Sequence, residues 1–150
     1  MMSSLLASLA ARSVMACGLI QVSASPGEAV SPTRFSGVQY NSPGSDTGSN
    51  RSLNAEWVVI TNHSSRAQVM TGWKLRDRTG YIFTFPTFSL GAGRSVKIHT
   101  GSGANSRTDL YWRQGYYVWN NTGDKAILKN RSGVVVDTCS WGDGSGYTGC

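Results

Sequence analysis

Residues able to perform acid–base or nucleophilic chemistry are few in this chain. The only histidines, His63 and His99, both lie among polar residues, and neither is part of an H-x-x-x-H pair or near an acid at metal-binding spacing. The G-x-S-x-G elbow of serine hydrolases is absent. Residues 101–103 form a Gly-Ser-Gly loop without the lysine of a phosphate-binding loop. Four aspartates lie on predicted turns or strand ends, where Asp commonly caps the backbone: Asp109, Asp124, Asp137 and Asp143.

These observations indicate a protein without catalytic activity and without a cofactor. Paired-carboxylate catalysis, in a small hydrolase whose site has no recognisable motif, is the alternative.

A Gly- and Ser-rich stretch offers the hard oxygen ligands that calcium prefers. Its spacing is not that of an EF-hand, so the stretch predicts no firm metal site. The simpler interpretation is a polar loop with Asx turns. If calcium does bind, its ligands come from Asp46, Asn50, Asn54 and Glu56, with Asn41 nearby.

The first 24 residues are typical of a secretory signal peptide. Arg12 is the only charge before Glu28, and a mostly apolar run of ten follows it at 13–22. Val22-Ser23-Ala24 supplies the small residues of a cleavage site, so we expect cleavage after Ala24. A frayed tail behind a misassigned start codon is an alternative.

Export would make the protein extracellular, with a disordered mature N-terminus at 25–32 and a folded domain at 33–150. Lipoprotein anchoring through Cys17 is a second alternative. However, Met15 fits the lipobox poorly, and Arg12 is too close to Cys17 to leave room for a clean hydrophobic region. No stretch approaches the roughly 20 apolar residues of a membrane-spanning helix.

The cysteines that remain after cleavage predict a disulfide. Cys17 leaves with the signal peptide, and Cys139 and Cys150 form an even pair in an oxidising compartment. The flexible Gly-rich loop between them lets the two thiols meet, so we expect a bond that holds the C-terminal tail to the last strand. Two free thiols, or metal ligation, are the alternatives.

The elements that must position these residues are strands. Short runs alternate apolar and polar residues, with β-branched and aromatic enrichment, and turn signals follow every ten residues or so. The resulting prediction is an all-β sandwich, with three tryptophans and alternate apolar residues in its core. The runs are 58–60, 73–76, 81–85, 96–99, 125–129 and 134–136, and the core set is Trp57, Trp73, Leu75, Val96, Ile98, Trp119, Ala126 and Leu128. No segment of the mature chain has helical periodicity, and 101–122 is expected to be an extended connection packed by aromatic rings.

The outward positions of these strands carry much of the positive charge. The formal net charge is +6, and removing Arg12 with the signal peptide leaves +5. If the strands neighbour each other, their cations form a stripe that favours anionic polymers such as nucleic acid or phosphate-bearing envelope polymers. The alternative is that these charges only provide solubility and cover sheet edges. The cations concerned are Lys74, Arg76, Lys97, Lys125 and Lys129.

The order of the runs resembles the lamin tail domain, an immunoglobulin-like sandwich found in nuclear lamins and in many secreted bacterial proteins. The resemblance covers about 33–141, and the Gly-Trp-Lys-Leu, Phe-Pro, Leu-Gly-Ala-Gly and Trp-Asn-Asn elements are specific only together. The matching segments are 53–62, 71–77, 81–103, 108–112, 118–138 and 139–141. The resemblance implies no activity, and the signal peptide places the chain with the exported bacterial-type members, so nuclear partners do not carry over.

Three hypotheses follow for function. The first is a monomeric, non-catalytic module for binding, adhesion or targeting, whose partner is a protein, an envelope surface or a polymer. The second is a binder of nucleic acid or other anionic polymers through a basic strand face. The third is the small hydrolase already named.

Overall fold

The computed structural model describes residues 30–150. The predicted signal peptide 1–24, including Cys17, lies outside the described residues, as does most of segment 25–32. At the end of that segment, the carbonyl of Pro32 accepts a hydrogen bond from the N–H of His63 (2.7 Å). No helix among residues 30–150 is long and apolar enough to cross a membrane.

Five strands form the first layer. They are β1 (Thr33–Gln39), β2 (Trp57–Asn62), β7 (Ser95–His99), β8 (Asp109–Tyr111) and β11 (Tyr147–Gly149), in the spatial order β11-β1-β2-β7-β8. All neighbours are antiparallel except β7 and β8, which are parallel.

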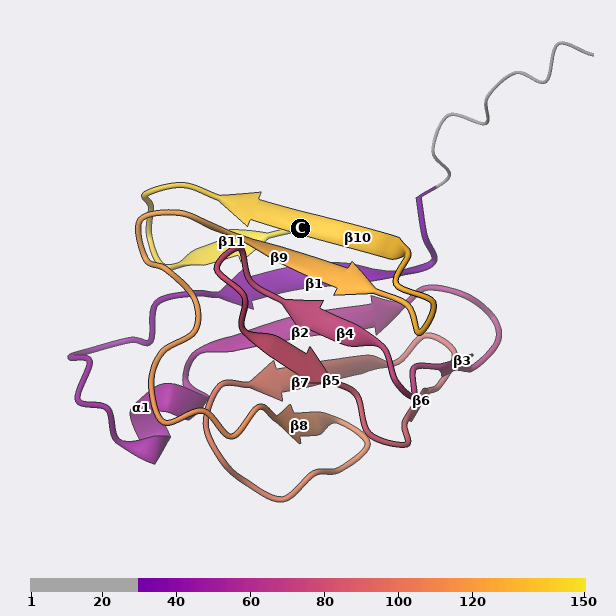
Figure 1. Ribbon diagram of the computed structural model, residues 1–150, viewed down its shortest axis with the longest axis horizontal. Helices are drawn as coiled ribbons and strands as arrows, with labels where there is room; N and C mark the ends of the chain where they lie inside the picture. Colours follow the sequence, from indigo (N-terminus) through magenta and orange to yellow (C-terminus); the bar gives the residue numbers. More distant parts are fainter. Residues whose placement is uncertain (1–29) are drawn as a thin grey trace, which may run out of the picture.

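The second layer has four antiparallel strands in the order β10-β9-β4-β5: β10 (Val135–Trp141), β9 (Asp124–Lys129), β4 (Lys74–Arg76) and β5 (Ile82–Thr84). A small sheet of β3 (Gln68–Val69) and β6 (Ser89–Leu90) lies at one end, as Figure 1 shows.

The two layers, drawn in Figure 1, enclose one apolar core of buried side chains. The two-residue period of the strands places Leu75 opposite Leu128 in the register, both fully buried, while the next residues along each strand face outward. Burying each such aliphatic side chain stabilises the fold by about 1.5–3 kcal/mol. The predicted immunoglobulin-like β-sandwich is confirmed, and so are seven core residues: Trp73, Leu75, Val96, Ile98, Trp119, Ala126 and Leu128.

Three local expectations are wrong. Trp57 is only half-buried, because it belongs to the outward-facing set of β2, whose alternate residues Val58 and Ile60 fill the core. A short helix, α1 (Asn50–Asn54), lies in the stretch expected to be loop; it is capped by the Ser49 hydroxyl and is too short to show a helical period. The segment 101–122 contains the strand β8 and is therefore not a pure connection.

Candidate functional site

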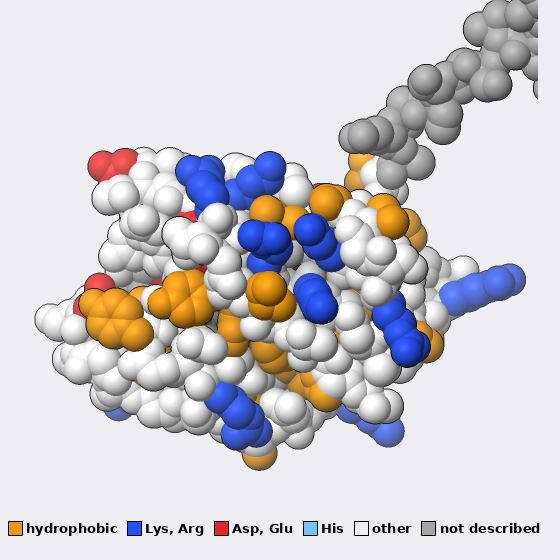
Figure 2. Space-filling view, in the orientation of Figure 1, with side chains coloured by type: hydrophobic (Ala, Val, Ile, Leu, Met, Phe, Trp, Pro, Cys, Tyr) orange, Lys and Arg blue, Asp and Glu red, His pale blue; other side chains and the backbone are white. Residues whose placement is uncertain are grey.

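The outer face of the four-stranded sheet carries adjacent cations. Lys74 of β4 and Lys129 of β9 are direct partners in the register, and Arg76 and Lys125 are outward-facing residues of the same two strands. Figure 2 shows the blue side chains gathered over this sheet, with orange ones between them. Like charges directly opposite each other in a sheet repel, so this arrangement costs stability. We call Lys74, Arg76, Lys125 and Lys129 the basic face.

The acids of this sheet do not neutralise the basic face. Asp77 and Asp124 are buried, and their carboxylates accept hydrogen bonds of 2.7–3.2 Å from backbone N–H groups of nearby turns. Asp137 accepts the N–H of Phe35, a residue of the opposite layer (2.8 Å). Among residues 30–150 the one ion pair joins His99 to Asp109. The four cations are therefore without a carboxylate partner in that range.

The strands that carry the predicted stripe do not all neighbour each other. Lys97 lies on β7 in the other layer, where its Nζ is 4.3 Å from the centroid of the Trp57 ring. Arg131, which the sequence did not single out, lies in the β9–β10 turn with its stem over Gly72; a Cβ on Gly72 would be 3.3 Å from its Cγ. Gly72 comes two residues before Lys74, so Arg131 lies beside the basic face. Because Arg131 lies in a turn, no strand alternation or register predicts its position beside the basic face.

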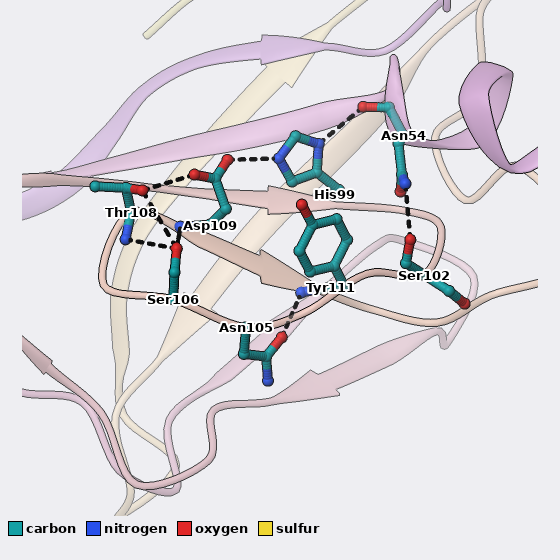
Figure 3. Close-up of polar contacts among 8 residues, drawn as sticks. All are labelled: Asn54, His99, Ser102, Asn105, Ser106, Thr108, Asp109 and Tyr111. Atoms are coloured by element: carbon teal, nitrogen blue, oxygen red, sulfur yellow. Dashed lines mark hydrogen bonds and ion pairs between the residues drawn. The ribbon is translucent and has the colours of Figure 1, made fainter.

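The outer face of the five-stranded sheet has a cluster centred on His99 (Figure 3). Its Nδ1 is 2.8 Å from the carbonyl oxygen of Asn54, and its Nε2 is 2.7 Å from Oδ1 of Asp109 on the neighbouring strand. A carbonyl oxygen and a carboxylate both accept hydrogen bonds, so each ring nitrogen faces an acceptor. The Tyr111 ring stacks on the imidazole with 4.8 Å between centroids.

This cluster is not arranged as a nucleophile and its base. The hydroxyl of Thr108 donates to Oδ2 of Asp109 (2.7 Å), and the hydroxyl of Ser106 accepts the Asp109 N–H (3.1 Å), so both point toward the carboxylate side and not toward the histidine. Hydrogen bonds from His99, then from Thr108, lower the pKa of Asp109. Each ring nitrogen of His99 faces an oxygen acceptor, and neither is directed at a hydroxyl. The cluster joins β7 and β8 to the end of α1.

The calcium candidates lie around α1. The side-chain Nδ2 atoms of Asn50 and Asn54 both donate to the carbonyl of Ser102 (2.9 Å each), so these amides tie α1 to the loop that contains Ser102. Asp46 is exposed, whereas Glu56 is buried. Within the described part of the chain, no group of three or more His, Cys, Asp or Glu side chains is placed to hold a metal ion. Calcium binding stays a prediction.

Glu56 is a buried carboxyl that links the two layers. It is 1% exposed, and its Oε1 accepts from the Thr100 hydroxyl (2.7 Å) and from the N–H groups of Val118 (2.8 Å) and Trp119 (3.2 Å). Its Oε2 has no partner among residues 30–150. Burial raises the pKa of Glu56 to about 7, against the opposing effect of these hydrogen bonds. The segment before β2 is thereby tied to the segment before β9.

The predicted disulfide is confirmed. Cys139 on β10 is bonded to Cys150, the residue after β11, with Cα atoms 5.8 Å apart. Because β10 and β11 belong to different sheets, the bond joins the two layers as well as holding the C-terminal tail.

Comparison with known proteins agrees with this architecture. No curated protein matches the sequence. The family model described as Lamin Tail Domain matches residues 26–143, a range that includes every strand from β1 to β10 and the whole basic face. The match covers most of the chain and confirms the resemblance drawn from the sequence. The chain therefore belongs to the lamin tail domain family.

Proposed function

We propose that this lamin tail domain is a secreted, non-catalytic module that docks onto a phosphate-bearing polymer through its basic face. Lamin tail domains are immunoglobulin-like binding modules and not enzymes. The observation that carries the proposal is the pairing of Lys74 with Lys129 on an outward-facing surface, with Arg76 and Lys125 beside them and no carboxylate among them. A polyanion bound over this surface would attract both lysines and offset the repulsion between them.

The surroundings of the basic face suit a polymer. Ile82, opposite Arg76, and Val135, opposite Lys129, are 50% and 52% exposed, so uncharged side chains flank the cations on both sides. The cations lie side by side on the two central strands of the sheet, where a long, flexible chain of phosphates can contact several of them at once. Each phosphate that a cation neutralises releases condensed counterions, which makes binding strongly dependent on salt.

Titration of the domain, over a series of salt concentrations, with a short labelled DNA duplex and with linear polyphosphate tests the proposal. Four contacts predict that the logarithm of the binding constant falls by about 3–4 per decade of salt. The double substitution Lys74→Gln with Lys129→Gln is expected to reduce this slope by about 2 and to weaken binding at every salt concentration.

The control is Lys97→Gln, which removes one positive charge, against two in the double variant, from the opposite layer and should leave the slope unchanged. Binding to DNA alone identifies nucleic acid, and binding to both probes identifies the phosphate chain. Absence of binding to either, or equal losses for the basic-face and Lys97 variants, would overturn the proposal.

Secretion and a monomeric state complete the proposal. The disulfide between Cys139 and Cys150 supports export, since such bonds persist in oxidising compartments. Three of the four edge strands of the two layers, β5, β8 and β11, have three residues each, which limits pairing with a second copy there, whereas the fourth, β10, has seven residues. Fractionation of the native host, and sedimentation of the purified domain, check these two points.

A further inference from the structure

A second cationic feature lies away from the basic face, at the end of the sandwich formed by β6 and the beginnings of β7 and β8. A hollow of about 470 Å³ is lined there by Arg94 and Arg107 together with Ser89 and Ser95, and the buried Leu90 also lines it. Ser95 is the first residue of β7, Arg94 immediately precedes it, and Arg107 precedes β8. Since β7 and β8 are parallel, the chain brings both arginines to the same end of the sheet.

The two guanidinium groups are not neutralised by the protein. No hydrogen bond or ion pair joins either group to another side chain in the described range, and none of the residues lining the hollow is an acid. The nearest acid along the chain, Asp109, is already paired with His99 and accepts from Thr108. The positive charge of Arg94 and Arg107 is thus left for a ligand.

The aliphatic stem of Arg94 packs against a glycine. The stem lies across Gly91 in the β6–β7 turn, where a Cβ on residue 91 would be only 3.1 Å from the Arg94 Cγ. A glycine at this place lets the stem cross the turn.

A second hollow adjoins the first. It has a volume of about 420 Å³ and shares Ser89 and Arg107 with its neighbour. The rest of its lining is uncharged, and includes Pro86, Phe88 and Asn105. Arg107 therefore stands between a doubly cationic hollow and a neutral one.

We propose that these two hollows form a site for a phosphate or sulfate ester, with the oxyanion between Arg94 and Arg107 and the neutral esterified group, such as a sugar, in the second hollow. Guanidinium groups bind oxyanions through paired N–H donors. The two positive charges of Arg94 and Arg107 match a doubly charged phosphate better than they match a singly charged carboxylate. The Ser89 and Ser95 hydroxyls can add donors. The site is independent of the basic face and does not rest on polymer binding.

Titration of the full chain with glucose 6-phosphate, glucose 6-sulfate and inorganic phosphate, followed by two-dimensional amide NMR at constant ionic strength, tests this site. Saturable shifts are expected at residues of the β6–β7 turn and of the loop before β8. Glucose 6-phosphate should bind more tightly than inorganic phosphate, because only the ester reaches the second hollow. The sulfate ester distinguishes a site for doubly charged phosphate from one that accepts either group.

Arg94→Gln and Arg107→Gln are each expected to weaken binding of glucose 6-phosphate about tenfold or more, because each removes a charge-assisted contact. Gly91→Ala should also weaken it, since the added methyl group displaces the Arg94 stem without removing a charge. Lys74→Gln with Lys129→Gln is the control and should leave ester binding unchanged, so that failure of this site and failure of polymer docking are separate results.

Two results would overturn the site: absence of saturable binding by any of the three probes, or equal affinity of the original protein and both arginine variants. Equal affinity for inorganic phosphate and for both esters would remove the second hollow from the proposal. Thermal unfolding of each variant verifies that the fold is retained.

Discussion

The outer faces of the two sheets differ in whether their charged side chains have partners within the protein. On the five-stranded sheet, His99 is held between Asp109 and a backbone carbonyl, and Lys97 lies over the Trp57 ring. On the four-stranded sheet, Lys74 faces Lys129, and the carboxylates of that sheet are turned toward backbone N–H groups.

The difference separates charges that stabilise the fold from charges that are free to bind. A cation with an internal partner has already gained its interaction energy, and a ligand must compete for it. A cation opposite another cation gains energy only when an anion arrives. This contrast supports the proposed docking role of the four-stranded sheet and gives the histidine cluster a structural role.

The largest expected effect comes from breaking the covalent link between the two layers. Cys139→Ser with Cys150→Ser should lower the free energy of unfolding by about 3 kcal/mol, because the bond closes a loop with a sequence separation of 11. Urea denaturation of both proteins without reductant measures this loss. The reduced original protein should unfold with the variant, and polymer binding should persist in native conditions. A loss below about 1 kcal/mol would show that the other contacts between the layers suffice.

Glu56, a second link between the layers, should make stability depend on pH. Its pKa is raised from 4.5 to about 7, so the folded state holds the proton more tightly than the unfolded chain does. The contribution is fully present below about pH 4.5 and is lost as the pH rises through 7, a total of about 3 kcal/mol. Glu56→Gln keeps an acceptor for the three donors but cannot ionise.

The free energy of unfolding, measured by urea denaturation at about pH 5 and about pH 8, gives the test as a difference between the two proteins. The original protein should lose stability relative to Glu56→Gln as the pH rises. Asp46→Asn is a control that removes only a minor contribution to the same shift. A constant difference across this range would mean that the hydrogen bonds from Thr100, Val118 and Trp119 offset burial.

The alternation of apolar and polar residues in the sequence predicted part of this structure. The two-residue period predicted that Leu75 and Leu128 face the core, and the family motifs gave the order of the strands along the chain. Strand β1 was not predicted, because a bulge between Phe35 and Gly37 interrupts its alternation. The period also predicted which cations face outward.

The period could not predict which strands are neighbours, and that is why Lys97 seemed part of the stripe while Arg131 was overlooked. The burial of Glu56 was equally inaccessible, because its partners Thr100 and Val118 lie 44 and 62 residues away in the chain. Contacts over such separations depend on the tertiary fold and leave no local pattern.

A smaller effect is expected on the five-stranded face. Asp109→Asn should lower the free energy of unfolding near neutral pH by about 0.5–1 kcal/mol, since the carboxylate is 37% exposed and solvent screens its pairing with His99. The lowered pKa of Asp109 means that its contribution is present above the unfolded value of 3.8 and disappears as the pH falls through the still lower folded value. Chemical denaturation at neutral and strongly acidic pH measures both limits. Asp143→Asn, at an exposed position, should leave stability unchanged; an equal loss in both variants would contradict the role given to the pair.

The last predicted changes in the free energy of unfolding come from single lysine substitutions, and they have opposite signs on the two faces. Lys129→Gln should raise the free energy of unfolding by about 0.2–1 kcal/mol, because it removes the repulsion from Lys74. Lys97→Gln should lower it by about 0.5–1 kcal/mol, because it removes the cation from the Trp57 ring. Urea denaturation at low salt resolves the difference, and the gain from Lys129→Gln should shrink at high salt because ions screen exposed charges. If both substitutions destabilised the domain, Lys129 would have an internal partner, and the four-stranded sheet would lose the free charge on which its proposed docking role depends.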